Sequence, residues 1–505
     1  MNSIYKALGA AALAIGMCGC GDDFLNVTSP TQPSSDEYFS EKDHVEEAVV
    51  AAYDPLQWTD WGMNEYAPYT MMSDIMADDF WVGGANANDN QNWHLMANFE
   101  ATPLKVITSL WIEGFSGIKR CNDVLEDIEK GVDGATDADI ALWQAQVYVL
   151  RAFYANWLWK FYGNVPYYER NLTFPYIAEQ VSADDLYAYM VSDIEKALEL
   201  KALPWRSPDS EAGRITTAMA YMLYAEIVMY QRDNSRYPTA LRYMKEIIDS
   251  PEYDLAPDYT KIFKPEGEWC QESIFEINYI SENATRDWGA PLTAGGTVLP
   301  TLISPNNWPS GGDGHNGGWG FCPLRLETYE MFSPDDKRRD ATCWNVAATG
   351  IEYNKRYQDF GLFLEKYAAQ ADGNAGQKAS SELNYNNNWR IFRYSEALLN
   401  AAELLVATGG SNAEAKGYLN AVRKRAGLKT ELEPTLDNIL AERRLEFVGE
   451  GKRYWDLIRT DRAATTLVPD TYGYRTNTWS PNKKHLPIPQ SEIDRSQGTL
   501  TQNPY

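Results

Sequence analysis

Two pairs of helical segments constrain the fold of this 505-residue chain more than any other feature. Residues 216–230 are apolar almost throughout. After a short polar turn, residues 238–248 continue with the three-to-four residue spacing of an amphipathic helix. Residues 394–407 and 412–425 repeat this arrangement. Alanines lie where the two helices of a pair could approach closely, which indicates a core built from paired helices.

Further helices are predicted around these pairs. Residues 111–128 place an apolar side chain every three or four positions, and residues 141–162 are apolar on most sides, as in a buried helix. The second of these is expected to stop at Gly163, and Ser182 is expected to begin another helix. Such pairs resemble tetratricopeptide units, although no strict period can be counted. The predicted fold is therefore mostly α, with a scaffold of degenerate tetratricopeptide-like helix pairs.

Two stretches that carry tryptophans break this helical pattern. Residues 280–320 contain Gly, Pro and Asn throughout, and residues 81–93 are a shorter stretch of the same composition. Long irregular segments inside a compact protein are usually functional, because binding residues favour loops held by a scaffold. We therefore expect an irregular, loop-rich ligand-binding subdomain beside the helical scaffold.

The N-terminus has the pattern of an export signal. Lys6 precedes a short apolar run at residues 7–15, which is too short to cross a bilayer. The run ends before Gly19 and Cys20, which resemble the cleavage and lipidation site of a bacterial lipoprotein. A cleaved signal without a lipid is the alternative. The polar residues 21–36 are predicted to be a flexible tether.

Charge and cysteine content narrow the classes of partner. The net charge of −26 would repel phosphate backbones, so nucleic acid is excluded as a partner and a neutral ligand is favoured. The four cysteines that follow Cys20 form no CxxC pair. They allow either a disulfide between Cys322 and Cys343 or four free thiols. No cofactor is expected, with a structural cation left open.

Five stretches of the sequence resemble the SusD/RagB family of outer-membrane nutrient-binding lipoproteins. They occur in the family's order and are spread over nearly the whole chain. They are residues 20–25; 150–154 with 161–166; 393–397 with 402–403, 419–423 and 425–428; 442–447 with 450–451, 453 and 456–459; and 486–490 with 502–505.

This resemblance implies a location on the outer face of the outer membrane. It also implies a role in capturing oligosaccharides, or in some members peptides, for a SusC-type TonB-dependent transporter. The expected organisation is a signal peptide at 1–19, the lipidated Cys20 with a tether to residue 36, a helical region at 37–265 with an early binding loop near 78–99, a loop-rich ligand-binding region at 266–390, and a last helix pair with the C-terminal region at 391–505.

Tryptophans in the irregular segments are the candidate ligand contacts. An indole face matches the C–H face of a pyranose ring, and amides or carboxylates at the ring edge can bind sugar hydroxyls. The alternative is that these tryptophans only hold their own loops in place. Approximate position in related proteins favours Trp81, Trp288 and Trp308 among the candidates. The candidates are Trp81, Trp288, Trp308, Trp93, Trp319, Asp79, Asn92 and Asn306.

Catalysis is not expected. Glu442, Glu446 and Glu450 could suggest paired carboxylates for glycoside hydrolysis. Arginines 443, 444 and 453 lie close by in the sequence, so ion-paired packing of a charged helix is the favoured interpretation. The predicted function is non-catalytic capture of a neutral, glucose- or xylose-containing glycan. Peptide capture and, less favoured, glycoside hydrolysis are the alternatives.

Overall fold

The computed structural model describes residues 38–62, 65–311 and 313–505. The predicted signal peptide 1–19, the predicted lipidation site Cys20 and the tether to residue 36 lie outside the described residues. Within the described ranges, no helix combines the length and the apolar composition needed to cross a membrane. The larger helices are α3 (Lys42–Tyr53), α6 (Ser109–Lys130), α7 (Asp137–Tyr162), α8 (Ala183–Glu199), α9 (Thr217–Gln231), α10 (Tyr237–Ile248), α14 (Tyr394–Thr408), α15 (Asn412–Arg425) and α16 (Leu436–Glu446).

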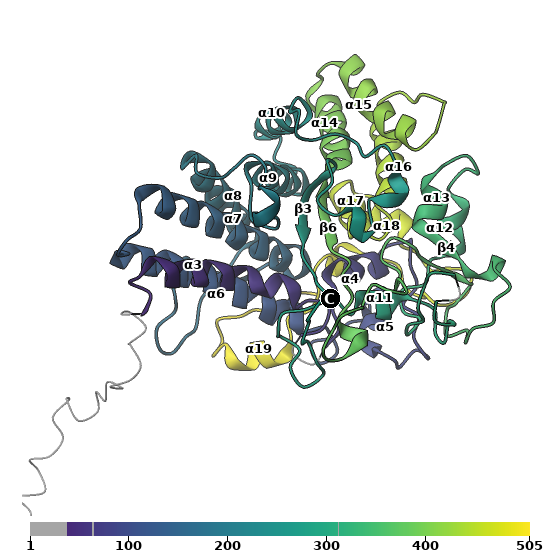
Figure 1. The fold of residues 1–505 in the computed structure, drawn as a ribbon, viewed down its shortest axis with the longest axis horizontal. Coiled ribbons are helices and arrows are strands. Elements are labelled where there is room, and N and C mark those ends of the chain that lie inside the picture. Colours follow the sequence, from purple (N-terminus) through teal and green to yellow (C-terminus); the bar gives the residue numbers. More distant parts are fainter. Residues whose placement is uncertain (1–37, 63–64, 312) are drawn as a thin grey trace, which may run out of the picture.

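These helices mostly pack against the next one along the chain. Helix α6 packs against α7, α7 against α8, and α9 against α10. Helix α10 then contacts α14, which pairs with α15, so the two helix pairs expected from the sequence are neighbours. Figure 1 shows α3, α6, α7 and α8 side by side, with α10, α14 and α15 farther along the array. The prediction of a mostly α fold built from helix pairs is confirmed.

Polar caps account for where the helices begin. The Thr136 hydroxyl accepts a hydrogen bond from the Asp139 N–H, and the Asp139 carboxylate accepts one from the Thr136 N–H. Helix α7 therefore starts at Asp137. The sequence predicted a start at residue 141, because the first turn of the helix is polar and shows no apolar periodicity. Ser182 caps α8 as predicted, and α7 ends before Gly163, whose φ is 70°.

The core is centred on α7, whose side chains are buried on all sides over its last four turns. Its Arg151 forms an ion pair of 2.7 Å with Asp193 of α8 and donates to the Asn122 side chain of α6, so one buried guanidinium joins three helices. The helical tryptophans predicted to be core residues are all buried, with exposed fractions of 5% or less: Trp111, Trp143, Trp157, Trp159 and Trp455.

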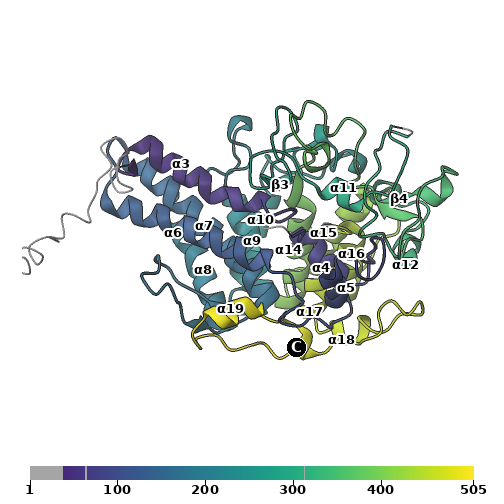
Figure 2. The same ribbon diagram turned by 90° about the horizontal axis from the view of Figure 1, so that it is seen from below.

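Short strands connect the helical scaffold to the loop-rich part. Strand β3 (Ser273–Ile277) pairs antiparallel with β6 (Trp389–Arg393), so the long segment between them leaves and returns at one place. Figure 2 shows this segment along the upper edge and the right-hand end of the molecule, with α18 (Ala463–Thr466) and α19 (Gln490–Arg495) along the lower edge. The segment contains α11 (Leu299–Ile303), α12 (Leu326–Glu330), α13 (Arg338–Thr342) and the hairpin of β4 (Cys343–Asn345) and β5 (Leu362–Leu364).

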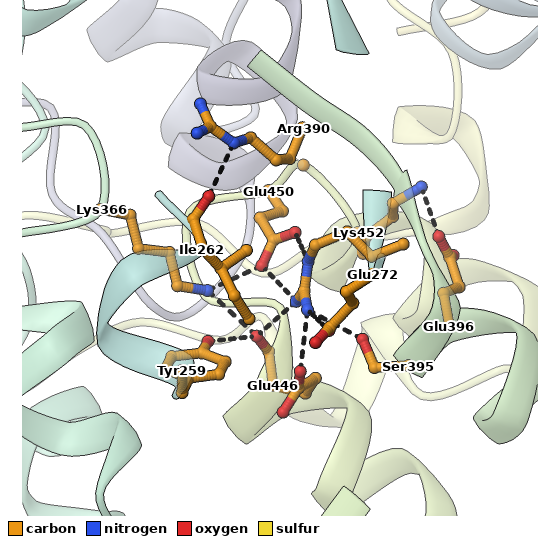
Figure 3. A network of polar contacts seen from close by, with 12 residues as sticks. Tyr259, Ile262, Glu272, Lys366, Arg390, Ser395, Glu396, Glu446, Glu450 and Lys452 are labelled. Carbon is orange, nitrogen blue, oxygen red and sulfur yellow. Dashed lines mark hydrogen bonds and ion pairs between the residues drawn. The ribbon is translucent and has the colours of Figure 1, made fainter. Parts of the chain in front are cut away.

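A network of buried ion pairs ties the C-terminal helices to the rest of the molecule (Figure 3). Arg393, at the end of β6, lies 2.6 Å from Glu272, 2.9 Å from Glu446 and 2.8 Å from Glu450. Glu450 also contacts Lys366 at 2.7 Å. All these side chains are at most 2% exposed, so each charge depends on its partners rather than on water.

The predicted ion pairing of the three glutamates is confirmed, but their expected partners were wrong. Helix α16 ends at Glu446, so Glu450 lies beyond the helix. The three carboxylates face inward and meet cations from distant parts of the chain: Arg338, Arg423, Arg425, Arg393 and Lys366. The neighbouring arginines pair elsewhere: Arg443 with Asp456 and Glu396, Arg444 with Asp78 and Asp79, and Arg453 with Asp78.

The cysteine side chains decide between the two alternatives left open by the sequence. Cys121, Cys270, Cys322 and Cys343 are all free thiols in the structure. Cys121, Cys322 and Cys343 are buried, and burial raises the pKa of each thiol. A buried thiol with a raised pKa is a poor nucleophile, so these cysteines act as small core residues.

Candidate functional site

Four aromatic side chains from three separate segments form a cluster that reaches the surface of the loop-rich part. The rings of Trp61 and Tyr66 are 4.4 Å apart, and Trp61 meets Trp288 edge-on at 5.5 Å. Trp319 stacks with Trp288 at 5.9 Å and meets Tyr66 at 5.5 Å. Each ring therefore contacts two others. We call this set, Trp61, Tyr66, Trp288 and Trp319, the aromatic platform.

The platform is accessible to a ligand. Trp288 is 38% exposed, which is high for a tryptophan, and the other three side chains are partly exposed. Burial raises the pKa of Tyr66 to about 12, so its phenol keeps its proton at neutral pH and can donate or accept a hydrogen bond. The platform therefore offers apolar ring faces with a hydroxyl group beside them.

A buried ion pair holds the first two segments of the platform together. Arg286 donates to both oxygens of Asp60, at 2.7 and 3.1 Å, and also to the backbone carbonyl of Trp61 at 2.6 Å. The Asp60 carboxylate accepts further bonds from the Thr297 hydroxyl and the Val298 N–H, both at 2.7 Å. Because Trp61 follows Asp60 and Trp288 lies two residues after Arg286, this pair sets the distance between the two indoles.

Backbone contacts position the third segment. The N–H of Trp319 donates to the Thr301 carbonyl at 2.7 Å, and the Gly318 N–H donates to the Pro305 carbonyl at 2.9 Å. A side chain at Gly318 would have no room, since a Cβ there would lie 2.2 Å from the Thr301 oxygen. The close approach of residue 318 to the Thr301 carbonyl of α11 therefore requires glycine and fixes where Trp319 emerges.

Two of the candidate tryptophans predicted from the sequence, Trp288 and Trp319, are brought together in the platform. Trp93 lies behind it, only 1% exposed, and its indole N–H donates to the Tyr66 carbonyl at 3.0 Å. It also lies on helix α5 (Gln91–Ala97) rather than on the expected loop. Asn306 donates to the Gly318 carbonyl at 3.0 Å, so both side chains support the platform from inside.

The structure places the remaining candidates away from the platform rings. Trp308 is 3% exposed and packs with Trp344 in a small separate apolar cluster. Asp79 is buried and paired with Arg444 at 2.7 Å, and the Asn92 amide donates to the Val106 carbonyl. Trp81 is 3% exposed, lies under the Arg325 guanidinium and lines a separate cavity, described below.

Sequence reasoning missed Trp61 and Tyr66. Both lie in an irregular stretch between α3 and α4 (Tyr69–Met76), close to Gly62. The same combination of aromatic residues with Gly and Asn that marked residues 81–93 occurs at residues 58–66, and it could have identified them. What the sequence lacks is any sign that Asp60 pairs with an arginine 226 positions away.

The glutamates that could suggest hydrolysis lie inside the ion-pair network. No group of three or more His, Cys, Asp or Glu side chains among the described residues is placed to hold a metal ion. Glu446 and Glu450, part of the only carboxylate set that suggested hydrolysis, are fully buried, and neighbouring cations hold the pKa of each below its ordinary range. A carboxylate kept ionised and closed to solvent cannot protonate a leaving group.

Two family models match this chain. The model described as the SusD family matches residues 333–505, and the model described as "Starch-binding associating with outer membrane" matches residues 23–228. Among curated proteins, the SusD-like protein P2 of Formosa agariphila is 23% identical, with 97% of this chain and 98% of that protein covered. The two models thus match an early and a late part of the chain, and the SusD-like relative matches nearly all of it.

Solved structures give a stronger likeness. The surface glycan-binding protein A from Bacteroides thetaiotaomicron in complex with laminarihexaose is 61% identical, with a TM-score of 0.89 and coverage of 92% of this chain and 99% of that chain. Surface glycan-binding protein A from Bacteroides uniformis is 50% identical, with a TM-score of 0.84 and the same coverage. Identities this high over nearly whole chains indicate shared ancestry and a shared fold.

Proposed function

Since this chain belongs to the SusD family of glycan-binding proteins associated with the outer membrane, we propose that its aromatic platform captures a neutral, glucose-containing oligosaccharide without altering it. The observation that carries the proposal is the platform itself. Four aromatic rings in mutual contact are held by a buried ion pair and remain partly open to solvent.

The chemistry of the platform suits a sugar chain. Pyranose rings present flat faces of C–H groups, and these stack on indoles because the electron-rich face of the indole attracts slightly positive hydrogens. Rigid rings lose little conformational entropy on binding, and the packing of the four rings restricts them further. The protein's net charge of −26 favours an uncharged glycan over an anionic one.

Laminarihexaose is the first ligand to test, because a relative 61% identical to this chain is named as its complex. Isothermal titration of laminarihexaose should give saturable binding at one site, and a maltose-series hexasaccharide titrated in parallel shows whether the platform selects the linkage between the glucose units. If neither sugar binds, nor any neutral polysaccharide in native affinity electrophoresis, the proposal is wrong.

The two alternative functions give different results in the same assays. A peptide-capturing protein would release heat with mixed peptides and none with the sugar. A glycoside hydrolase would convert laminarihexaose to shorter products on prolonged incubation, and chromatography would detect them. Binding of intact sugar, recovered at full length, supports capture without catalysis.

Gly318→Ala should weaken sugar binding while most of the fold is retained. The new Cβ would lie 2.2 Å from the Thr301 oxygen, so the backbone beside Trp319 must move, at a cost of about 1–3 kcal/mol in stability. We expect laminarihexaose affinity to fall about tenfold in titration calorimetry. Gly289→Ala is the matched control, because it lies beside Trp288 but its Cβ would meet only Asp287 Oδ1 at 3.9 Å. Equal affinities for the two variants would contradict the positioning role of residue 318.

We further propose that Cys20 carries the lipid that keeps the protein at the outer face of the outer membrane, where it delivers the glycan to a SusC-type transporter. Cys20→Ala should leave laminarihexaose affinity unchanged, because all four platform side chains lie between positions 61 and 319. It should also release the protein from the membrane fraction of cells, as judged by fractionation and immunoblotting. Retention of the variant at the membrane would rule out Cys20 as the anchor.

A further inference from the structure

Two buried arginines stand apart from the others in this protein. In the described part of the chain nine arginines are buried as whole residues, and seven of them form ion pairs with carboxylates. The exceptions are Arg325 and Arg475, which are 8% and 3% exposed and have no carboxylate at ion-pairing distance within the described ranges. Burying an unpaired charge is costly, so such groups require a specific explanation.

Both exceptions line the same cavity, which has a volume of about 260 Å³. It lies beside helices α4 and α5 and the loop that carries Tyr474. Its other walls include the aromatic side chains of Trp81, His94 and Tyr357. One carboxylate, Glu100, also lines the cavity, and it accepts hydrogen bonds from the side-chain amides of Asn98 and Asn477. None of the platform side chains lines this cavity, so the two sites are distinct.

The position of Arg475 is explained by the fold alone. Its guanidinium donates to the carbonyls of Met76 and Ala77, at 3.1 and 2.7 Å, at the C-terminal end of α4. A cation is favoured there because the last carbonyls of a helix carry partial negative charge. Burial, together with the nearby Arg325, lowers the pKa of Arg475 to about 9. The positive charge of Arg325 therefore destabilises the positive charge of Arg475 and does not neutralise it.

The position of Arg325 is not explained in this way. Its Nε donates to the Phe80 carbonyl at 3.1 Å, and one face of the guanidinium lies 3.8 Å from the centre of the Trp81 ring. No hydrogen bond of Nη1 or Nη2 occurs among the described residues. The pair of nitrogens that remains is the edge with which arginine forms two parallel bonds to a carboxylate.

The nearest carboxylates are already engaged. Asp78 and Asp79 bind Arg444, and Asp78 also binds Arg453. Asp470 accepts the backbone N–H groups of residues 472, 474 and 475. These groups contribute negative potential from a distance, yet none of them occupies the free edge of Arg325.

We propose that this cavity is a binding site for a carboxylate, held by the free edge of Arg325 and surrounded by Trp81, Tyr357 and Tyr474. A sugar acid and a small aliphatic acid share this chemistry. The aromatic walls and the Asn88 and Gln91 amides at the cavity favour the sugar acid, because a ring bearing hydroxyl groups uses both. This site is distinct from the platform, and the two arginines in its wall supply local positive charge for an anion despite the net charge of −26 that favours a neutral glycan elsewhere.

Titration calorimetry at constant ionic strength tests the proposal with sodium glucuronate, sodium acetate and sodium sulfate. We expect glucuronate to bind at one site and more tightly than acetate, with its affinity unchanged by saturating laminarihexaose. Equal binding of glucuronate and acetate would still support a carboxylate site and assign it to small acids in general. No saturable binding of either carboxylate, or tighter binding of sulfate than of both, would overturn it.

Two variants locate the site. Arg325→Met keeps the packing on Trp81 but removes the Nη1 and Nη2 donors, and it should weaken glucuronate binding about tenfold or more. Gln358→Glu is a second, independent test in case the Arg325→Met variant does not fold. Gln358 Oε1 accepts the N–H groups of Val82 and Gly83 at 3.0 and 2.9 Å, and a carboxylate can accept them too while adding negative charge at the cavity wall. It should also weaken glucuronate binding. Unchanged binding in either folded variant would refute the assignment.

Discussion

Replacing Arg393 with alanine is expected to lower the free energy of unfolding by about 3–5 kcal/mol. The Arg393 guanidinium bonds three carboxylates, of Glu272, Glu446 and Glu450, and all of these groups are shielded from water (Figure 3). Its removal leaves the three carboxylates with one positive charge fewer inside the protein. The other cations of the network are already paired, so none is free to replace Arg393. Urea unfolding followed by circular dichroism measures the change.

The matched control is an arginine whose ion pair lies on the surface. Arg170 pairs with Glu129 at 2.7 Å, and these side chains are 68% and 55% exposed. Arg170→Ala should change stability by less than about 1 kcal/mol, since water and salt screen such a pair. If Arg393→Ala were as mild as the control, the buried network would not hold the C-terminal helices in place.

Replacing Trp288 or Trp319 with alanine should cost about 2 kcal/mol or more of laminarihexaose binding, which is about 30-fold in Kd. The two indoles stack on each other at 5.9 Å, and Trp288 is the most exposed ring of the platform. Each removal therefore takes away a sugar-stacking face and also loosens the remaining ring. The double variant should lose detectable binding in titration calorimetry.

A second exposed aromatic residue provides the control for the tryptophan variants. Tyr176 is 69% exposed and lies in the loop after α7, outside the platform. Tyr176→Ala should leave laminarihexaose affinity unchanged. Loss of binding in this variant, or retained binding in the Trp288 and Trp319 variants, would place the sugar elsewhere on the protein.

Helical periodicity predicted most of the scaffold because local spacing decides which face of a helix is buried. Residues 412–425 coincide with α15, and residues 216–230 differ from α9 by one residue at each end. The ion pairs could not be predicted in the same way. Glu446 meets Arg338 and Arg393, and such partners depend on how distant segments return to one place in the folded chain.

The platform shows the same limit. Composition identified Trp288 and Trp319 as loop tryptophans. Approximate position in related proteins then ranked Trp81 and Trp308 equally with Trp288. Their exposure differs because of partners far along the chain: Arg325 covers Trp81, and Trp344 packs on Trp308. The composition of residues 58–66 could have marked Trp61 as a loop tryptophan, but no local pattern reveals the Asp60–Arg286 pair that places it beside Trp288.

A crystal structure of the protein with laminarihexaose tests the central claim most directly. Our account predicts that sugar rings lie against Trp288 and Trp319, with hydroxyl groups near Tyr66, and that the Asp60–Arg286 pair stays in place. Electron density for the sugar at another surface, with the four platform rings bare, would contradict it.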